Sequence, residues 1–208
     1  MELSFSEVIS HLPKGKYIAV QRCLKGKINM SGFYTMNIAG LERQLPICPL
    51  NENIDIAGFI IFGDVELTIK ACEELLKKLP EFDYIVTPEA KSIPLAYEMS
   101  RQCGKKYFVA RKRAKLYMRD PVEVNVRSIT TDAVQTLILD GADGEQIRGK
   151  RVVVLDDVIS TGESLKAMDA LMEKFDVEVV AKAAVLAEGD AADRTDIVFL
   201  EKLPLLFK

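Results

Sequence analysis

Two adjacent carboxylates precede a loop of small hydroxyl residues in the segment VVVLDDVISTGES, residues 152–164. Its four apolar residues predict a buried strand, and Asp156 and Asp157 follow at the carboxyl end of that strand. A helix should begin after the loop, so unpaired backbone N–H groups and the positive end of the helix dipole would attract an anion there. The loop therefore predicts a phosphate site, formed by Ser160, Thr161, Gly162, Glu163 and Ser164.

The two acids must bind something other than the phosphate, because a carboxylate repels an anion. Their oxygens suit sugar hydroxyls, or a cation with its water shell. The alternative is a plain helix N-terminus in which the acids only complement the dipole. A Walker-type nucleotide loop is excluded, because the sequence contains no GxxxxGK[ST] segment.

Positive charge is available in two further places. Residues 87–98, TPEAKSIPLAYE, predict a tight turn between a strand and a helix, and Lys91 lies in that turn. Residues 111–115, RKRAK, carry four positive charges in five positions directly after another predicted strand. Such a run usually forms a solvated surface, but cations are also the partners that a departing phosphate group needs.

Alternating helix and strand signals must position these residues. Asp64 is a good N-cap for an amphipathic helix, and Gly104 is suited to end the next one. We expect helices at residues 65–79, 92–103 and 163–175, and strands at 84–86, 107–110, 136–139, 151–155 and 177–186. Repeated strand–helix–strand units predict an α/β fold with a parallel sheet, helices on both faces and ligands at the carboxyl ends of the strands. The first 60 or so residues are more irregular, with β-rich pieces at 17–20 and 33–36.

The composition suits one domain, or one domain with a small appendage, because 208 residues with 49% hydrophobic content can bury a full core. A net charge of -3 argues against a nucleic-acid partner. Four cysteines without CxxC spacing and a single histidine, His11, give no zinc cluster, and we expect reduced, packed thiols. No signal-peptide pattern and no membrane-spanning stretch is evident, so a cytoplasmic location without membrane contact is expected.

The segment VVVLDDVISTGES resembles the signature with which type I phosphoribosyltransferases bind phosphoribosyl pyrophosphate (PRPP). The resemblance implies the fold of that family: a central, mainly parallel sheet flanked by helices, a small hood subdomain and a β-containing N-terminal region. Residues 56–208 would form the phosphoribosyltransferase domain, and residues 1–55 would contribute to the hood or to a dimer. Asp156 and Asp157 would hold the ribose hydroxyls, while the loop from Ser160 to Ser164 would receive the 5′-phosphate.

Both positively charged places fit the same resemblance. The turn after Thr87 is similar to the pyrophosphate loop of adenine and xanthine enzymes. This similarity implies four pyrophosphate contacts, made through main-chain amides and the lysine side chain: Glu89, Ala90, Lys91 and Ser92. The segment RKRAKL is similar to the RKRGKL-type segment of adenine phosphoribosyltransferases. That similarity implies three more residues that reach pyrophosphate, partly across a homodimer interface: Arg111, Lys112 and Lys115.

A flexible lid and a base site complete what the resemblance implies. Residues 117–130 correspond to the lid, whose closure would exclude water and prevent hydrolysis of PRPP. The segment AGFIIFGDVEL resembles the PGVVFRD region of adenine enzymes, which meets the base through main-chain groups. It implies a base site at Ile61, Phe62 and Gly63, although Phe62 could equally be plain core. The tail at residues 186–206 resembles a hood over the base.

The expected reaction joins adenine to PRPP and gives AMP and pyrophosphate, a purine salvage reaction. Xanthine enzymes place a lysine near the position of Gly189, and its absence here favours adenine. Mg²⁺ would bridge pyrophosphate and ribose oxygens and would be held mainly by PRPP, with no side-chain ligand assigned. The alternatives are transfer to xanthine or another base, and a non-catalytic regulator that senses PRPP. Such regulators carry a DNA-binding module and a strongly basic face, and neither is evident.

Overall fold

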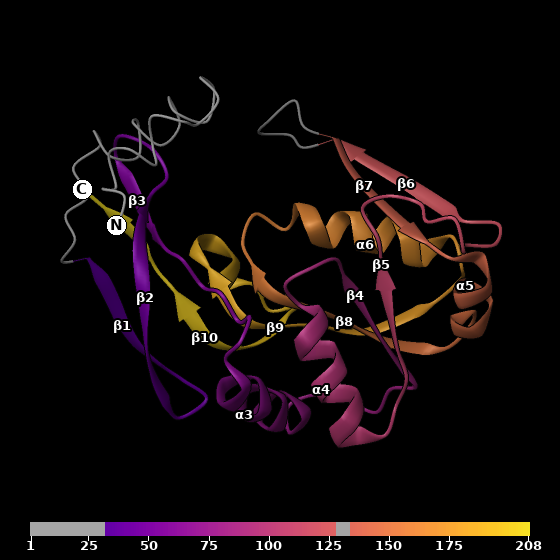
Figure 1. Ribbon diagram of the computed structural model, residues 1–208, viewed down its shortest axis with the longest axis horizontal. Helices are drawn as coiled ribbons and strands as arrows, with labels where there is room; N and C mark the ends of the chain where they lie inside the picture. The colour runs from indigo at the N-terminus through magenta and orange to yellow at the C-terminus, as the bar shows by residue number, and fades with distance from the viewer. Residues whose placement is uncertain (1–31, 128–133) are drawn as a thin grey trace, which may run out of the picture. The chain divides into compact units, whose positions relative to one another are not determined.

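The computed structural model describes residues 32–127 and 134–208 (Figure 1). Residues 33–208 form one compact unit. The β-rich piece predicted at 17–20, together with His11 and Cys23, lies outside the described residues. The predicted domain boundary between residues 55 and 56 falls inside a strand, β3 (Ile54–Ala57), and the division stays a prediction.

A five-stranded parallel sheet occupies the centre of this unit, as the sequence predicted. Its strands run in the order β10-β9-β8-β4-β5, and every neighbouring pair is parallel. Their bounds are β4 (Tyr84–Pro88), β5 (Tyr107–Ala110), β8 (Arg151–Ile159), β9 (Glu178–Glu188) and β10 (Val198–Leu203). The middle strand, β8, is buried from Val152 to Asp157, so the acidic pair lies inside the strand rather than after it.

Helices cover both faces of the sheet (Figure 1). α3 (Val65–Leu76) and α4 (Ile93–Cys103) pack in one apolar cluster, and α6 (Glu163–Glu173) packs in the other, with the short α5 (Gly141–Ile147) at its edge. The capping predictions are confirmed. Asp64 Oδ1 accepts a hydrogen bond of 3.0 Å from Leu67 N, and Gly104 ends α4 with φ of 71°.

A second, antiparallel sheet has the order β1-β2-β3-β11. It consists of β1 (Phe33–Ile38), β2 (Leu41–Pro49), β3 and β11 (Leu205–Phe207). The tail at residues 186–206 was expected to be hood, and this is wrong for β10, which extends the central sheet instead. Pro204 separates β10 from β11, and because proline lacks an N–H it interrupts the ladder and lets the chain change sheets.

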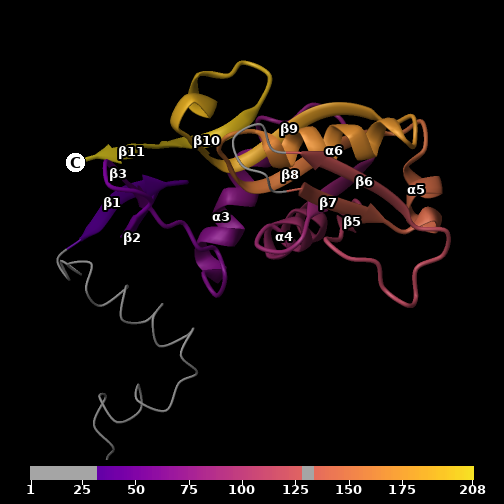
Figure 2. The same cartoon turned by 90° about the horizontal axis from the view of Figure 1, so that it is seen from above.

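A hairpin lies over α6 and includes part of the segment predicted to form a flexible lid. β6 (Val122–Arg127) pairs with β7 (Val134–Leu139) beside α6 (Figure 2). Val124 and Leu137 pack into the cluster that contains α6. In residues 122–127 valines alternate with polar residues, as they do in a half-buried strand, and the lid itself stays a prediction. The tip of the hairpin lies outside the described residues.

The cysteine prediction holds in part. Cys72 is fully buried, with its Sγ 3.3 Å from the carbonyl oxygen of Leu95, whereas Cys48 is exposed and does not pack in the core. The described Cys48, Cys72 and Cys103 are free thiols. No helix in the described part of the chain has the length and apolarity needed to cross a membrane.

Candidate active site

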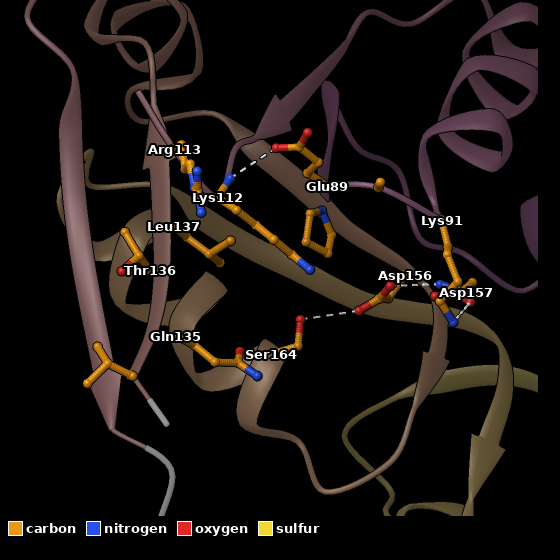
Figure 3. A pocket seen from close by; sticks show the side chains of 13 residues that line it. Glu89, Lys91, Lys112, Arg113, Gln135, Thr136, Leu137, Asp156, Asp157 and Ser164 are labelled. Carbon is orange, nitrogen blue, oxygen red and sulfur yellow. Dashed lines mark hydrogen bonds and ion pairs between the residues drawn. The ribbon is translucent and has the colours of Figure 1, made fainter. Parts of the chain in front are cut away.

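A cavity of about 600 Å³, here called the main cavity, opens where β4, β5 and β8 reach their carboxyl ends (Figure 3). The edge of a parallel sheet at which strands end is the usual place for a ligand. The cavity brings together seven of the residues predicted from the sequence: Glu89, Ala90, Lys91, Lys112, Asp156, Asp157 and Ser164. The strand order places the turn after β4 directly beside the acidic pair of β8.

The acidic pair is buried and hydrogen-bonded. Asp156 is 8% exposed and Asp157 is 4% exposed. Asp156 Oδ1 accepts a hydrogen bond of 2.9 Å from Asp157 N, and Ser164 Oγ lies 3.3 Å from Asp156 Oδ2. Burial, followed by the negative charge of Asp157, raises the pKa of Asp156 from 3.8 to about 7. Near neutral pH the Asp156 carboxyl can therefore either accept or donate a hydrogen bond.

Lys91 supplies the counter-charge of this pair. Its Nζ lies 2.5 Å from Asp157 Oδ2, and both side chains line the main cavity (Figure 3). The Lys91 side chain is 47% exposed, so its ammonium group stays within reach of a ligand. Ser92 differs from its neighbours, because it is buried, donates to the carbonyl oxygen of Pro88 over 2.9 Å and does not line the main cavity. The peptide bond between Glu89 and Ala90 is cis.

The predicted phosphate loop forms a smaller cavity of about 130 Å³ at the start of α6. All five predicted residues line it: Ser160, Thr161, Gly162, Glu163 and Ser164. Gly162 has φ of 78°, a left-handed conformation that glycine adopts without strain, and it precedes the first helical residue. Ser164 also lines the main cavity, so the two cavities adjoin. The N-terminus of α6 therefore faces a space that suits a phosphate group.

The basic segment after β5 divides between two cavities. Lys112 and Arg113 line the main cavity, whereas Arg111 lines a separate cavity of about 450 Å³ beside Tyr117. Lys115 does not line the main cavity. The structure thus brings one of the three predicted basic residues to the acidic pair, and it adds Arg113, which belongs to the same charge run.

Sequence reasoning also missed the strand that faces the acidic pair. Gln135 and Thr136 of β7 line the main cavity, and Gln135 also lines the cavity of the predicted phosphate loop. The β-like run from Thr136 to Leu139 was visible in the sequence, but it carries no motif that points to a ligand. Its place in the site follows from the packing of the hairpin over α6.

The predicted base segment does not line the main cavity. Ile61 is fully buried and Phe62 is 53% exposed, so Phe62 is not a core residue. Ile61 and Gly63 line a cavity of about 440 Å³ beside α3 and α4. Arg43 on β2 holds the end of this segment, with Nε 2.6 Å from Asp64 Oδ2. The hydrogen bond from Arg43 lowers the pKa of Asp64, so the pair stays ionised at neutral pH.

The donor set of the site fits a metal ion only in part. Within residues 32–127 and 134–208, no three His, Cys, Asp or Glu side chains gather as a metal site. The acidic pair offers carboxylate oxygens, which suit Mg²⁺, but a six-coordinate ion would need further oxygens from water or from a substrate.

A parallel sheet with an acidic pair inside its middle strand, followed by the predicted phosphate loop, is the arrangement expected of a type I phosphoribosyltransferase. The family model described as "Phosphoribosyl transferase domain" matches residues 62–202, and the chain belongs to this family. The resemblance noted in the sequence is thereby confirmed, as is the expected fold.

Two relatives differ in the base that their names give. The chain is 34% identical over 128 residues to a hypoxanthine/guanine phosphoribosyltransferase of Methanothermobacter thermautotrophicus, covering 61% of this chain and 63% of the relative. It is 33% identical over 173 residues to an adenine phosphoribosyltransferase of Bifidobacterium longum, covering 76% and 83%. The first match thus spans less than two thirds of the relative's length. The crystal structure of adenine phosphoribosyltransferase from Thermoanaerobacter pseudethanolicus shares the fold, with a TM-score of 0.58, 23% identity and coverage of 68% and 84%.

Proposed function

We propose that the chain is a purine phosphoribosyltransferase that joins adenine to PRPP and forms AMP and pyrophosphate. One observation carries this proposal. The main cavity combines a buried acidic pair, a hydroxyl of the phosphate loop and three cations, Lys91, Lys112 and Arg113. These groups match the ribose hydroxyls, the 5′-phosphate and the pyrophosphate of a single PRPP molecule.

Each part of the site has a role in this reaction. Asp156 and Asp157 accept hydrogen bonds from the ribose hydroxyls, and the N-terminus of α6 with Ser164 binds the 5′-phosphate. A purine nitrogen forms a bond to the anomeric carbon while the carbon–oxygen bond to pyrophosphate breaks. The electron pair leaves with that oxygen, and the proton of the purine ring N–H passes to solvent or to the departing pyrophosphate. Lys91 and Lys112 stabilise the charge on the departing group, so catalysis consists of positioning and electrostatics. Mg²⁺, bound mainly through PRPP, would further neutralise the pyrophosphate.

The choice of adenine rests on the predicted base segment and on Gly189. Ile61 and Gly63 would meet the base through main-chain groups, and the exposed ring of Phe62 could stack on it. Near Gly189, where xanthine enzymes place a lysine, Leu205 fills the space: its Cδ1 lies 3.1 Å from the position of a Cβ atom on Gly189. An apolar neighbour there offers no hydrogen bond to a purine keto group. Xanthine or another base is the alternative.

We also propose a homodimer in the cytoplasm. Val65 on α3 and Tyr97 on α4 are 68% and 58% exposed and line the same cavity. Leu116, next to the basic segment, is fully exposed. Exposed apolar side chains of this size favour a protein interface, and Lys115 lies beside Leu116 where it could reach a partner subunit. Light scattering with size-exclusion chromatography would measure the expected dimer mass.

The testing experiment incubates the full chain with PRPP and Mg²⁺ against adenine, hypoxanthine, guanine, xanthine, uracil and orotate, with products read by mass spectrometry. AMP alone is the expected result. Formation of a different nucleotide would support the same mechanism with another base as the substrate. If PRPP bound but no base reacted, the PRPP-sensing regulator would replace the enzyme as the better interpretation.

A further inference from the structure

Glu89 binds the residues that follow β5 through both its main chain and its side chain. Its N donates to the carbonyl oxygen of Ala110 over 2.8 Å. Its Oε2 accepts a hydrogen bond of 3.1 Å from Lys112 N and lies 3.2 Å from Arg111 Nε. The Glu89 side chain is 24% exposed and lines the main cavity. The turn after β4 is thus fastened to the start of the basic segment.

A carboxylate in this place does not suit a pyrophosphate ligand, because the two repel one another. The sequence predicted a pyrophosphate contact through the main-chain N–H of Glu89, but that N–H donates to Ala110, and the prediction gave the side chain no role. The geometry gives it one. Within the described residues Arg111 Nε donates no hydrogen bond, so Arg111 contributes charge alone, and the directional contact of the carboxylate is the N–H of Lys112.

The bond to Lys112 lies where the basic segment changes direction. Arg111 exchanges two hydrogen bonds of 2.7 Å with Ile138, which hold it as a bridge to β7. The chain then bends at Lys112 and Arg113. Figure 3 shows Glu89 joined to Lys112 N, with the Lys112 side chain reaching into the cavity. Arg111 faces the other cavity, so the bend decides which cations meet the ligand.

We propose that Glu89 is a positioning residue that fixes this bend and so presents Lys112 and Arg113 to the pyrophosphate of PRPP. The inference rests on the proposed function. Two long cationic side chains on an unanchored bend would have to be ordered when the ligand binds, and that ordering weakens affinity. The hydrogen bond from Lys112 N to Glu89 orders this bend before the ligand binds, and Arg111 neutralises the charge of the Glu89 carboxylate.

The test measures binding by isothermal titration calorimetry with PRPP, pyrophosphate and ribose 5-phosphate, each with Mg²⁺. We expect Glu89→Ala to weaken PRPP and pyrophosphate binding about tenfold, the effect of losing one hydrogen bond to a charged group. Ribose 5-phosphate lacks the pyrophosphate, so its affinity should stay within about twofold. Glu89→Gln keeps an acceptor for Lys112 N and should stay within about threefold of the wild type for all three ligands.

Asp83→Ala is the matched control. Asp83 also accepts from a main-chain N–H, that of Arg151 over 2.9 Å, and pairs with the Arg151 guanidinium over 3.0 Å. It lies before β4, at the opposite end of the sheet from the main cavity. All three ligands should bind Asp83→Ala as they bind the wild type.

A mutant-cycle comparison tests whether Glu89 affects PRPP binding through the side chains of Lys112 and Arg113. In a background with Lys112→Met and Arg113→Met, the further change Glu89→Ala should leave PRPP affinity within about twofold. An additive tenfold loss there, equal weakening of ribose 5-phosphate, or an equal loss in Glu89→Gln would overturn the positioning role. A wild-type chain that binds no PRPP would refute the proposed function itself, whereas PRPP binding unchanged in Glu89→Ala would refute the positioning role alone.

Discussion

Asp156→Asn should make the protein more stable at pH 8, although it removes a charged group from the site. Burial raises the pKa of Asp156 to about 7, above the value of 3.8 expected when the chain is unfolded. The folded chain therefore holds a proton that the unfolded chain releases, and stability falls as the pH rises from about 3.8 to 7. Above pH 7 the Asp156 carboxyl is ionised in both the folded and the unfolded chain. The buried negative charge then lowers the stability of the folded chain by its full amount.

The magnitude follows from that pKa difference. At about 1.4 kcal/mol per pKa unit, it corresponds to an upper bound of about 4 kcal/mol. Asp156 and Asp157 titrate as a coupled pair, so replacing one of them removes only part of this destabilisation. We therefore expect Asp156→Asn to raise the free energy of unfolding by about 2 kcal/mol at pH 8, or Tm by roughly 4–8 °C for a chain of this length. The asparagine oxygen can accept from Asp157 N as Asp156 Oδ1 does, and its NH2 group can donate to Ser164 Oγ, which reverses the direction of that bond.

Differential scanning fluorimetry of wild type and Asp156→Asn at pH 8 and pH 5 measures the effect. At pH 5 the gain in Tm should fall to about a third, because the wild-type carboxyl is then protonated in the folded state. Asp83→Asn is the control, since hydrogen bonds from Arg151 lower the pKa of Asp83, and its substitution should not raise Tm at pH 8. A lower Tm of Asp156→Asn at pH 8, or an equal gain at both pH values, would refute the reasoning.

Three further outcomes are expected. The double variant Asp156→Asn with Asp157→Asn should abolish nucleotide formation without changing the far-UV circular dichroism spectrum, and full turnover would contradict the assigned role of the pair. Gly144→Ala should lower the free energy of unfolding by about 1–3 kcal/mol in urea, because its Cβ would lie 2.0 Å from Phe175 Cε1; unchanged stability would contradict the packing. Gly162→Ala should lower stability by about 1–2 kcal/mol, because φ of 78° is strained for alanine, and it should weaken PRPP binding, as calorimetry would measure.

Local patterns predicted the parts of the structure that depend on neighbouring residues. The strand, loop and helix of residues 152–164 are contiguous, so hydrophobic runs, glycine and the acidic pair indicate them directly. Asp64 and Gly104 cap helices by contacts within a few residues, and both were found where the sequence placed them. The parallel sheet followed from the repeated alternation of strands and helices.

Tertiary packing alone decided which side chains share the main cavity. Lys91 and Asp157 form an ion pair across 66 positions of sequence, because β4 lies beside β8. Arg111 turns away from the cavity since its main chain pairs with Ile138 of β7, while Lys112 is held by Glu89. A charge run of four cations does not say which of them faces a ligand. The sequence by itself determined the family and the chemistry available to it, whereas the direction of each side chain depends on strand pairings between distant segments.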